Sequence, residues 1–119
     1  MTIGVTCEHL CTYWLFMRNP KPDASVAELA DLFRLLGDHT RLRIVMACVE
    51  DPIAVGDIAA QLDLSSSLVS HHLRLLRAAR IVKADRQGKQ VFYTAADQHI
   101  SSVLADMLEH IGEEHTESD

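Results

Sequence analysis

Residues 55–79 read VGDIAAQLDLSSSLVSHHLRLLRAA, and this stretch decides the fold. Its first part predicts a short helix, because apolar residues recur at helical spacing at Val55, Ile58, Ala59 and Leu62. A polar turn at 63–66 separates this helix from a longer one, which runs from about Ser66 to Ala79. Two helices joined by a tight turn predict a helix-turn-helix.

The longer helix has two distinct faces. The apolar face carries Val69, Leu73 and Leu76. The other face is small, polar and basic, and we expect it to contact DNA through Ser66, Ser67, Ser70, His71, Arg74 and Arg77. The alternative is an amphipathic helix pair with a solvated arginine face, and these residues alone do not separate the two interpretations.

The adjacent histidines of the longer helix point about 100° apart, because an α-helix has 3.6 residues per turn. We expect His71 to face DNA or solvent and His72 to pack and hydrogen-bond inside the domain. Neither is expected to bind a metal.

The segment after the longer helix favours DNA binding. Residues 81–85 and 90–94 are rich in β-branched and aromatic residues, and the turn between them contains Gly88, which predicts a β-hairpin. Arg86 and Lys89 fall at the expected tip, from which they can reach a phosphate or the minor groove. A basic hairpin directly after a helix-turn-helix is a wing.

The charge distribution supports the same interpretation. The chain of 119 residues has a formal net charge of −6, which at first argues against a nucleic-acid partner. Between residues 65 and 96, however, six basic residues accompany one acid, a net charge of +5, so the rest of the chain carries −11. A basic block within an acidic protein is a local electrostatic footprint for nucleic acid.

Composition limits the remaining possibilities. The length fits one domain: we expect an N-terminal arm at 1–24, a winged helix-turn-helix domain at 25–113 and an acidic tail at 114–119. Three cysteines, no signal-peptide pattern and no apolar run of about 18 residues indicate a cytoplasmic protein. An enzyme is not expected, because no nucleophile and base form a recognisable constellation.

The last helix carries a pair of metal-binding residue types at each end. Asp97 and His99 stand at its start, with Asp97 as a plausible N-cap, and His110 and Glu113 stand at its end. His99 and His110 are about 16 Å apart along the axis, so one ion cannot reach both pairs within one chain. An antiparallel second copy would bring unlike ends together and create two N/O sites suited to zinc. The alternative is a solvated dimer helix.

The sequence resembles the ArsR/SmtB family of winged-helix metalloregulators over about residues 26–113. The resemblance rests on LGDHTRLRI at 36–44, VGDIA at 55–59, SLVSHHLRLL at 67–76 and RQGKQVFY at 86–93. It implies a mainly α fold with a β-hairpin wing (α+β), a winged helix-turn-helix that dimerises through its N- and C-terminal helices. It also implies a homodimeric repressor that binds operator DNA and releases it when metal binds.

The resemblance also bears on the metal site. Zinc sensors of this family with a site on the C-terminal helix carry Asp-x-His followed by His-x-x-Glu or His-x-x-His, and Asp97, His99, His110 and Glu113 match that pattern. Zn²⁺ is therefore the expected ion, although Co²⁺ and Ni²⁺ accept the same ligands. Glu114 or His115 remains an alternative to Glu113.

The cysteines leave a second interpretation open. Family members that sense thiophilic metals carry Cys-x-Cys where this chain has Ile53-Ala-Val-Gly-Asp57, so that site is not expected here. Cys7, His9 and Cys11 form a candidate second metal site. A repressor that senses thiol oxidation, persulfide or a thiophilic metal through Cys7, Cys11 or Cys48 is the alternative function, although Cys48 more closely resembles a buried apolar residue.

Overall fold

A computed structural model describes residues 22–113 of the chain. Cys7, His9 and Cys11 lie outside the described residues, as do Glu114 and His115, so the predictions for the arm and the tail are not tested. The chain divides into two compact units, residues 1–31 and 32–119. The described part of the first unit is the beginning of α2 (Asp23–Leu36).

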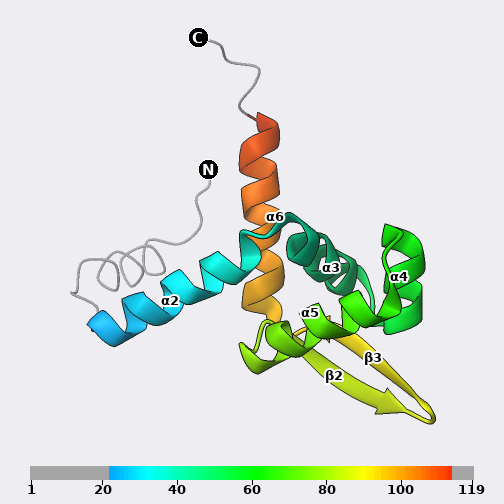
Figure 1. Cartoon of the computed structure of the whole chain (residues 1–119). Coiled ribbons are helices and arrows are strands. Elements are labelled where there is room, and N and C mark those ends of the chain that lie inside the picture. The colour runs from blue at the N-terminus through cyan, green and yellow to red at the C-terminus, as the bar shows by residue number, and fades with distance from the viewer. Residues whose placement is uncertain (1–21, 114–119) are drawn as a thin grey trace. The chain divides into compact units, whose positions relative to one another are not determined.

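The second unit contains the last turn of α2 and the seven elements that follow (Figure 1). In chain order these are α3 (His39–Glu50), β1 (Ile53–Ala54), α4 (Val55–Leu62), α5 (Ser66–Ala78), β2 (Val82–Gln87), β3 (Gln90–Ala95) and α6 (Gln98–Glu113). The helices α4 and α5 form the helix-turn-helix, and β2 and β3 form the wing. The predicted mainly α fold with a β-hairpin wing is confirmed.

Local capping explains the tight turn between α4 and α5. Asp63 adopts a left-handed conformation with φ of 59° and ends α4, which an Asp residue tolerates better than most. Two residues later the Ser65 side chain accepts a hydrogen bond from the Leu68 backbone N–H at 3.1 Å and begins α5. The end of α4 and the start of α5 are therefore fixed by two caps that are two residues apart in the sequence.

The sheet has one strand more than the sequence predicts. Its order is β1-β3-β2, and β1 pairs antiparallel with β3 through Ile53 opposite Tyr93 and Ala54 opposite Phe92. The sequence predicts only the two strands of the hairpin, so β1 was missed. A strand of two residues is too short to show an alternating pattern, and only its pairing with β3 identifies it.

The wing is tighter than predicted. The expected turn included Arg86, but Arg86 lies in β2 opposite Val91, and Gln87 pairs with Gln90, so only Gly88 and Lys89 make the turn. Gly88 has a φ of +66°, which glycine adopts without a steric penalty at the first central position of such a hairpin turn. Lys89 is at the tip as predicted, and Arg86 is set back from it by one residue.

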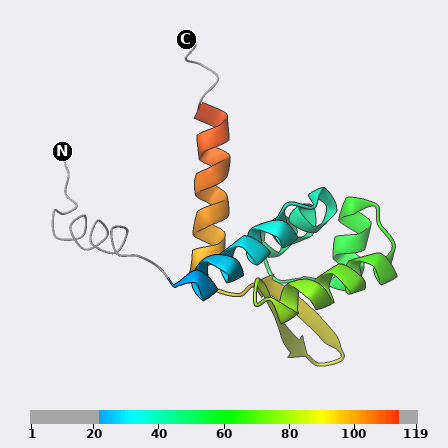
Figure 2. The same ribbon diagram turned by 60° about the vertical axis from the view of Figure 1, so that its left-hand side comes forward.

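One apolar core holds the second unit together. It is built by side chains of α3, α4, α5 and the start of β2, of which the most deeply buried are Ile44, Val45, Ile58, Val69, Leu73, Leu76 and Ile81. Ile100 and Leu104 bring the first turns of α6 against this core. Beyond them α6 extends away from α3, α4 and α5 (Figure 2).

Candidate nucleic-acid interface and metal centre

The recognition helix α5 separates its two faces as its sequence predicts. Val69, Leu73 and Leu76 have at most 1% of their surface exposed. The candidate DNA-contacting residues lie on the other side: Ser66, Ser67, His71, Arg74 and Arg77 are exposed and Ser70 is half-buried. The polar and basic face is therefore free of the core and available to a partner.

A groove of about 510 Å³ lies between α5 and the sheet. Its lining consists of Ser70, Leu73, Arg74, Arg77 and Ala78 from α5 and Tyr93 from β3. Tyr93 was not singled out from the sequence, because only the charged residues at the tip of the hairpin were considered as DNA contacts. Its position in a predicted strand was visible, but its place opposite two arginines follows only from the packing of β3 beneath α5.

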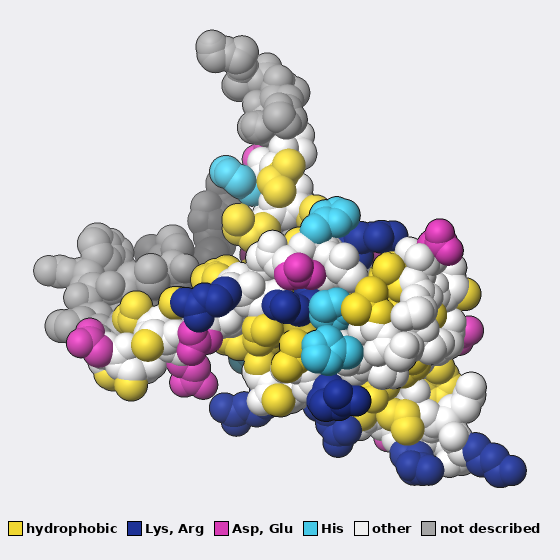
Figure 3. Space-filling view, viewed as in Figure 1, with side chains coloured by type: hydrophobic (Ala, Val, Ile, Leu, Met, Phe, Trp, Pro, Cys, Tyr) yellow, Lys and Arg dark blue, Asp and Glu magenta, His cyan; other side chains and the backbone are white. Residues whose placement is uncertain are grey.

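The wing extends the basic surface. Arg86 and Lys89 are exposed, as is Lys83 on the same hairpin. Figure 3 shows Lys and Arg side chains along the lower edge of this face, over α5 and the hairpin. The single acid of the basic block, Asp85, accepts a hydrogen bond from the Gln87 amide at 3.2 Å. This arrangement suits a polyanion whose backbone follows both elements.

At the start of α6, Asp97 and His99 come together. An Asp97 carboxylate oxygen accepts a hydrogen bond from the Ile100 backbone N–H at 3.1 Å, so Asp97 caps the helix as predicted. The same oxygen lies 3.6 Å from Nδ1 of His99, and both side chains are exposed. A carboxylate and an imidazole in this proximity provide two hard-to-borderline donors on one side of the helix.

His110 and Glu113 occupy the other end of α6, and both are exposed. His99 and His110 are eleven positions apart on the helix. At 100° and about 1.5 Å per residue, the two rings therefore differ in direction by only about 20° and lie about 16 Å apart along the axis. Within residues 22–113 no three His, Cys, Asp or Glu side chains converge on a common point. The described residues therefore present two pairs of donors, one at each end of α6.

A half-exposed apolar face of α6 runs between these two pairs. Its members are Val103, Met107, Leu108 and Ile111, which are 46%, 52%, 53% and 57% exposed. Counted at 100° per residue, His99 and His110 border this stripe on the same edge. Whatever covers the apolar stripe will thus also approach both histidines.

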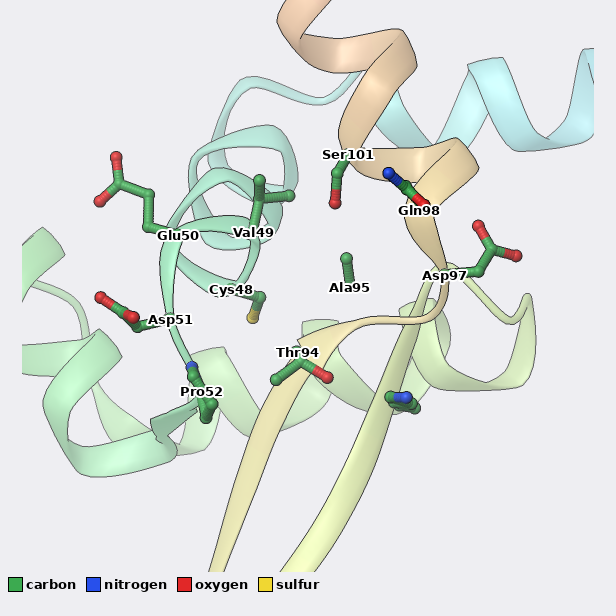
Figure 4. Close-up of a pocket in the computed structure, with 11 residues that line it drawn as sticks. Cys48, Val49, Glu50, Asp51, Pro52, Thr94, Ala95, Asp97, Gln98 and Ser101 are labelled. Carbon is green, nitrogen blue, oxygen red and sulfur yellow. The ribbon is translucent and has the colours of Figure 1, made fainter.

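Cys48 is buried, and its thiol has low reactivity. Only 1% of its surface is exposed, and burial raises the pKa of its thiol to about 12. The sulfur lies at the inner end of a pocket of about 320 Å³, with Gln98 and Ser101 of α6 across from it and the Asp97 carboxylate pointing away (Figure 4). At neutral pH the group is a neutral thiol, which is a poor nucleophile and a poor metal ligand.

The helices described here include none that is both long enough and apolar enough to span a bilayer.

Comparison with known proteins gives a consistent result. The family described as "Bacterial regulatory protein, arsR family" matches residues 38–84. The "Transcriptional repressor SmtB homolog" of Synechocystis sp. is 38% identical over 86 residues, which are 72% of this chain and 65% of that protein, just under two thirds. The "HTH-type transcriptional regulator CmtR" of Mycobacterium bovis is 41% identical over 81 residues, 68% of this chain and 69% of that one.

The fold comparison agrees with the sequence comparison. The solution structure of apo-NmtR superposes with a TM-score of 0.71 and 29% identity, covering 85% of each chain. The match extends well beyond residues 38–84 and includes elements on both sides of the helix-turn-helix.

Proposed function

Because this chain belongs to the arsR family of bacterial regulatory proteins, and is a DNA-binding transcriptional regulator and not an enzyme, we propose that it is a metal-responsive repressor. A homodimer binds operator DNA through α5 and the wing and releases it when Zn²⁺ or a similar divalent ion binds to α6. The observation that carries the proposal is the placement of His99 and His110, one from each donor pair, along one edge of a half-exposed apolar stripe.

The homodimer is supported by the apolar surfaces at both ends of the described chain. The stripe on α6 is about half exposed, and Val26, Leu29 and Phe33 of α2 are exposed to a similar degree. Apolar side chains on a long amphipathic helix are stabilised when a partner removes them from water, at about 25 cal/mol per Å². A second copy of the same helix is the partner with a matching stripe.

The metal sites follow from an antiparallel pairing of the two α6 helices. Asp97 and His99 of one protomer then meet His110 and Glu113 of the other, so a symmetric dimer has two equivalent sites. Two imidazoles and two carboxylates form an N/O donor set that suits Zn²⁺, Co²⁺ or Ni²⁺. Glu114 and His115, which lie outside the described residues, remain the alternatives to Glu113.

Coupling between metal and DNA requires that the two ligands favour different arrangements of the dimer. Two recognition helices that enter successive major grooves must be about 34 Å apart. A metal that links the α6 helices favours one relative orientation of the protomers, and release follows if this orientation misplaces α5. By linkage the effect is reciprocal and is typically about 1–3 kcal/mol.

The rival function, a thiol-based sensor, is less well supported by the described residues. Cys48 is inaccessible and its pKa is raised, which disfavours oxidation and metal binding at this position. Cys7, His9 and Cys11 lie outside the described residues and remain a candidate second metal site.

A regulator of bacterial genes acts where the chromosome is, so we expect the protein in the cytoplasm.

The test is a titration of DNA binding with metals. A duplex selected from a randomised library by the metal-free protein serves as the operator, and its affinity is measured against a panel of divalent ions. Zn²⁺ should weaken binding about 5- to 150-fold, the range that corresponds to typical coupling free energies. His99→Gln and His110→Gln should each abolish this response while the metal-free affinity stays unchanged.

His39→Gln is the matched control, because His39 is an exposed histidine at the start of α3 and is not one of the proposed metal donors. It should respond to Zn²⁺ as the wild type does. An undiminished response in both His99→Gln and His110→Gln would contradict the α6 site, and failure to select any duplex would contradict DNA binding itself.

A further inference from the structure

Arg41 of α3 connects three helices of the second unit. Its Nε donates a hydrogen bond to Nδ1 of His72 on α5 at 3.3 Å, and its Nη1 donates to the carbonyl oxygen of Leu35 in the last turn of α2 at 3.2 Å. Its backbone N–H donates to the Asp38 carboxylate at 3.0 Å, which caps α3. One side chain thus ties the end of α2 to the recognition helix, where His72 lies 31 residues after Arg41 in the sequence.

The hydrogen bond specifies the state of the His72 ring. Nδ1 accepts, so the proton of the neutral ring must be on Nε2. Burial lowers the pKa of His72, and the charge of Arg41 and the neighbouring His71 lower it further, whereas Asp38 raises it. The net direction is downward, so the ring is neutral at pH 7 and gains a proton only in more acidic solution.

His72 is well placed to influence how α5 presents itself to DNA. It follows His71, an exposed residue of the candidate DNA face, and precedes Leu73, which is anchored in the core. Because an α-helix is stiff over one turn, a shift at His72 also moves Arg74 and Ser70. The hydrogen bond between Arg41 and His72 therefore lies directly behind the surface that is proposed to contact DNA.

We propose that Arg41 and His72 are a positioning pair that holds the recognition helix in its DNA-binding orientation, and that protonation of His72 releases it. The inference rests on DNA binding by α5 but not on the metal site. A protonated ring carries hydrogen on both nitrogens, so Nδ1 can no longer accept from Arg41. It also places an imidazolium beside a guanidinium, with Asp38 the nearby carboxylate able to attract either.

The experiment compares DNA affinity across pH for the wild type and His72→Gln, with chelator present and the library-selected duplex as the probe. Glutamine keeps an oxygen that can accept from Arg41 but does not titrate. The two proteins should bind within about threefold of each other near pH 8, whereas near pH 5.5 the wild type should be about tenfold weaker than the variant. Both proteins contain all the other histidines, so the effects of those titrations cancel in the ratio of the two DNA affinities.

Two further variants distinguish positioning from general stabilisation. His72→Leu removes the acceptor and should lower the affinity about tenfold at every pH, without the pH-dependent change in ratio. His71→Gln alters the adjacent exposed ring and should retain the acid-induced loss. A ratio of wild type to His72→Gln that stays constant from about pH 8 to pH 5.5 would overturn the proposal. Loss of all DNA binding by the wild type would instead overturn the proposed function.

Discussion

The helices α5 and α6 are similar in sequence pattern and opposite in environment. Both are amphipathic, and each carries apolar residues at spacings of three and four. In α5 the apolar face is closed off by the core, with Leu73 and Leu76 at most 1% exposed. In α6 only the first turns contact the core through Ile100 and Leu104, and Leu108 and Ile111 are more than half exposed.

The difference shows which helix face the described residues cover and which they leave exposed. The α5 helix buries its apolar face in the core and leaves its polar and basic face exposed. The described residues leave the apolar face of α6 about half exposed and do not bring its donor pairs together, and His99 and His110 border that face on the same edge. Pairing with a second copy, as proposed, would bury the apolar face and combine the donor pairs. Each recognition surface for DNA should therefore be built from residues of one chain, whereas each metal site should need residues of two.

The largest expected effect is on stability. Leu73→Ala should lower the free energy of unfolding by about 2–5 kcal/mol at every protein concentration, because it leaves a cavity in the core of one chain. Leu108→Ala removes the same atoms from α6, and its cost should be small in dilute protein and grow with concentration as dimers form. Urea unfolding at several concentrations measures both. Equal, concentration-independent losses would remove the distinction between the two helices.

The next effect is on assembly. Leu108→Glu places a charge within the apolar stripe of α6, which should raise the dimer dissociation constant at least about tenfold, because a carboxylate would have to be desolvated. Ser102→Glu adds the same charge to the opposite side of α6 and serves as the control. Sedimentation equilibrium gives both constants. If Ser102→Glu dissociated the dimer and Leu108→Glu did not, the stripe would not be the seam.

The smallest effect concerns single phosphate contacts made by α5 and the wing. Arg74→Ala and Lys89→Ala should each weaken DNA binding several-fold and reduce the slope of log affinity against log salt by about 0.9 per lost contact. Arg34→Ala removes a charge from α2 and should leave that slope unchanged. Salt titrations with the selected duplex measure all three. Unaltered affinity in both Arg74→Ala and Lys89→Ala would show that α5 and the wing do not face the DNA.

Features encoded within one or two turns of chain were accessible from the sequence. The periodicity of 55–79 predicted α4, the turn and α5 to within a residue, and the inward side of Leu73 and Leu76 with it. Asp97 was predicted as the cap of α6, His71 as exposed, and His72 as hydrogen-bonded inside the domain, all of which the structure confirms. Helical and strand periods are local, so local residues reveal them.

Features that depend on the path of the chain were not accessible. The strand β1 exists because Ile53 meets Tyr93, forty residues away in sequence, and the same packing brings Tyr93 to the groove beside Arg74 and Arg77. The partner of His72 was likewise unknown until the fold placed Arg41 beside it. No pattern of single residues specifies which distant segment a given side chain will contact.

By itself, then, the sequence determined the helix-turn-helix, the basic wing and two pairs of metal-binding residue types on one amphipathic helix. Only the tertiary structure decided that, among the described residues, the apolar face of α5 is buried and that of α6 is left about half exposed. The reason is physical: amphipathicity states that a face must be buried, but burial is a contact between surfaces, and which surface provides it is settled only when the chain has folded.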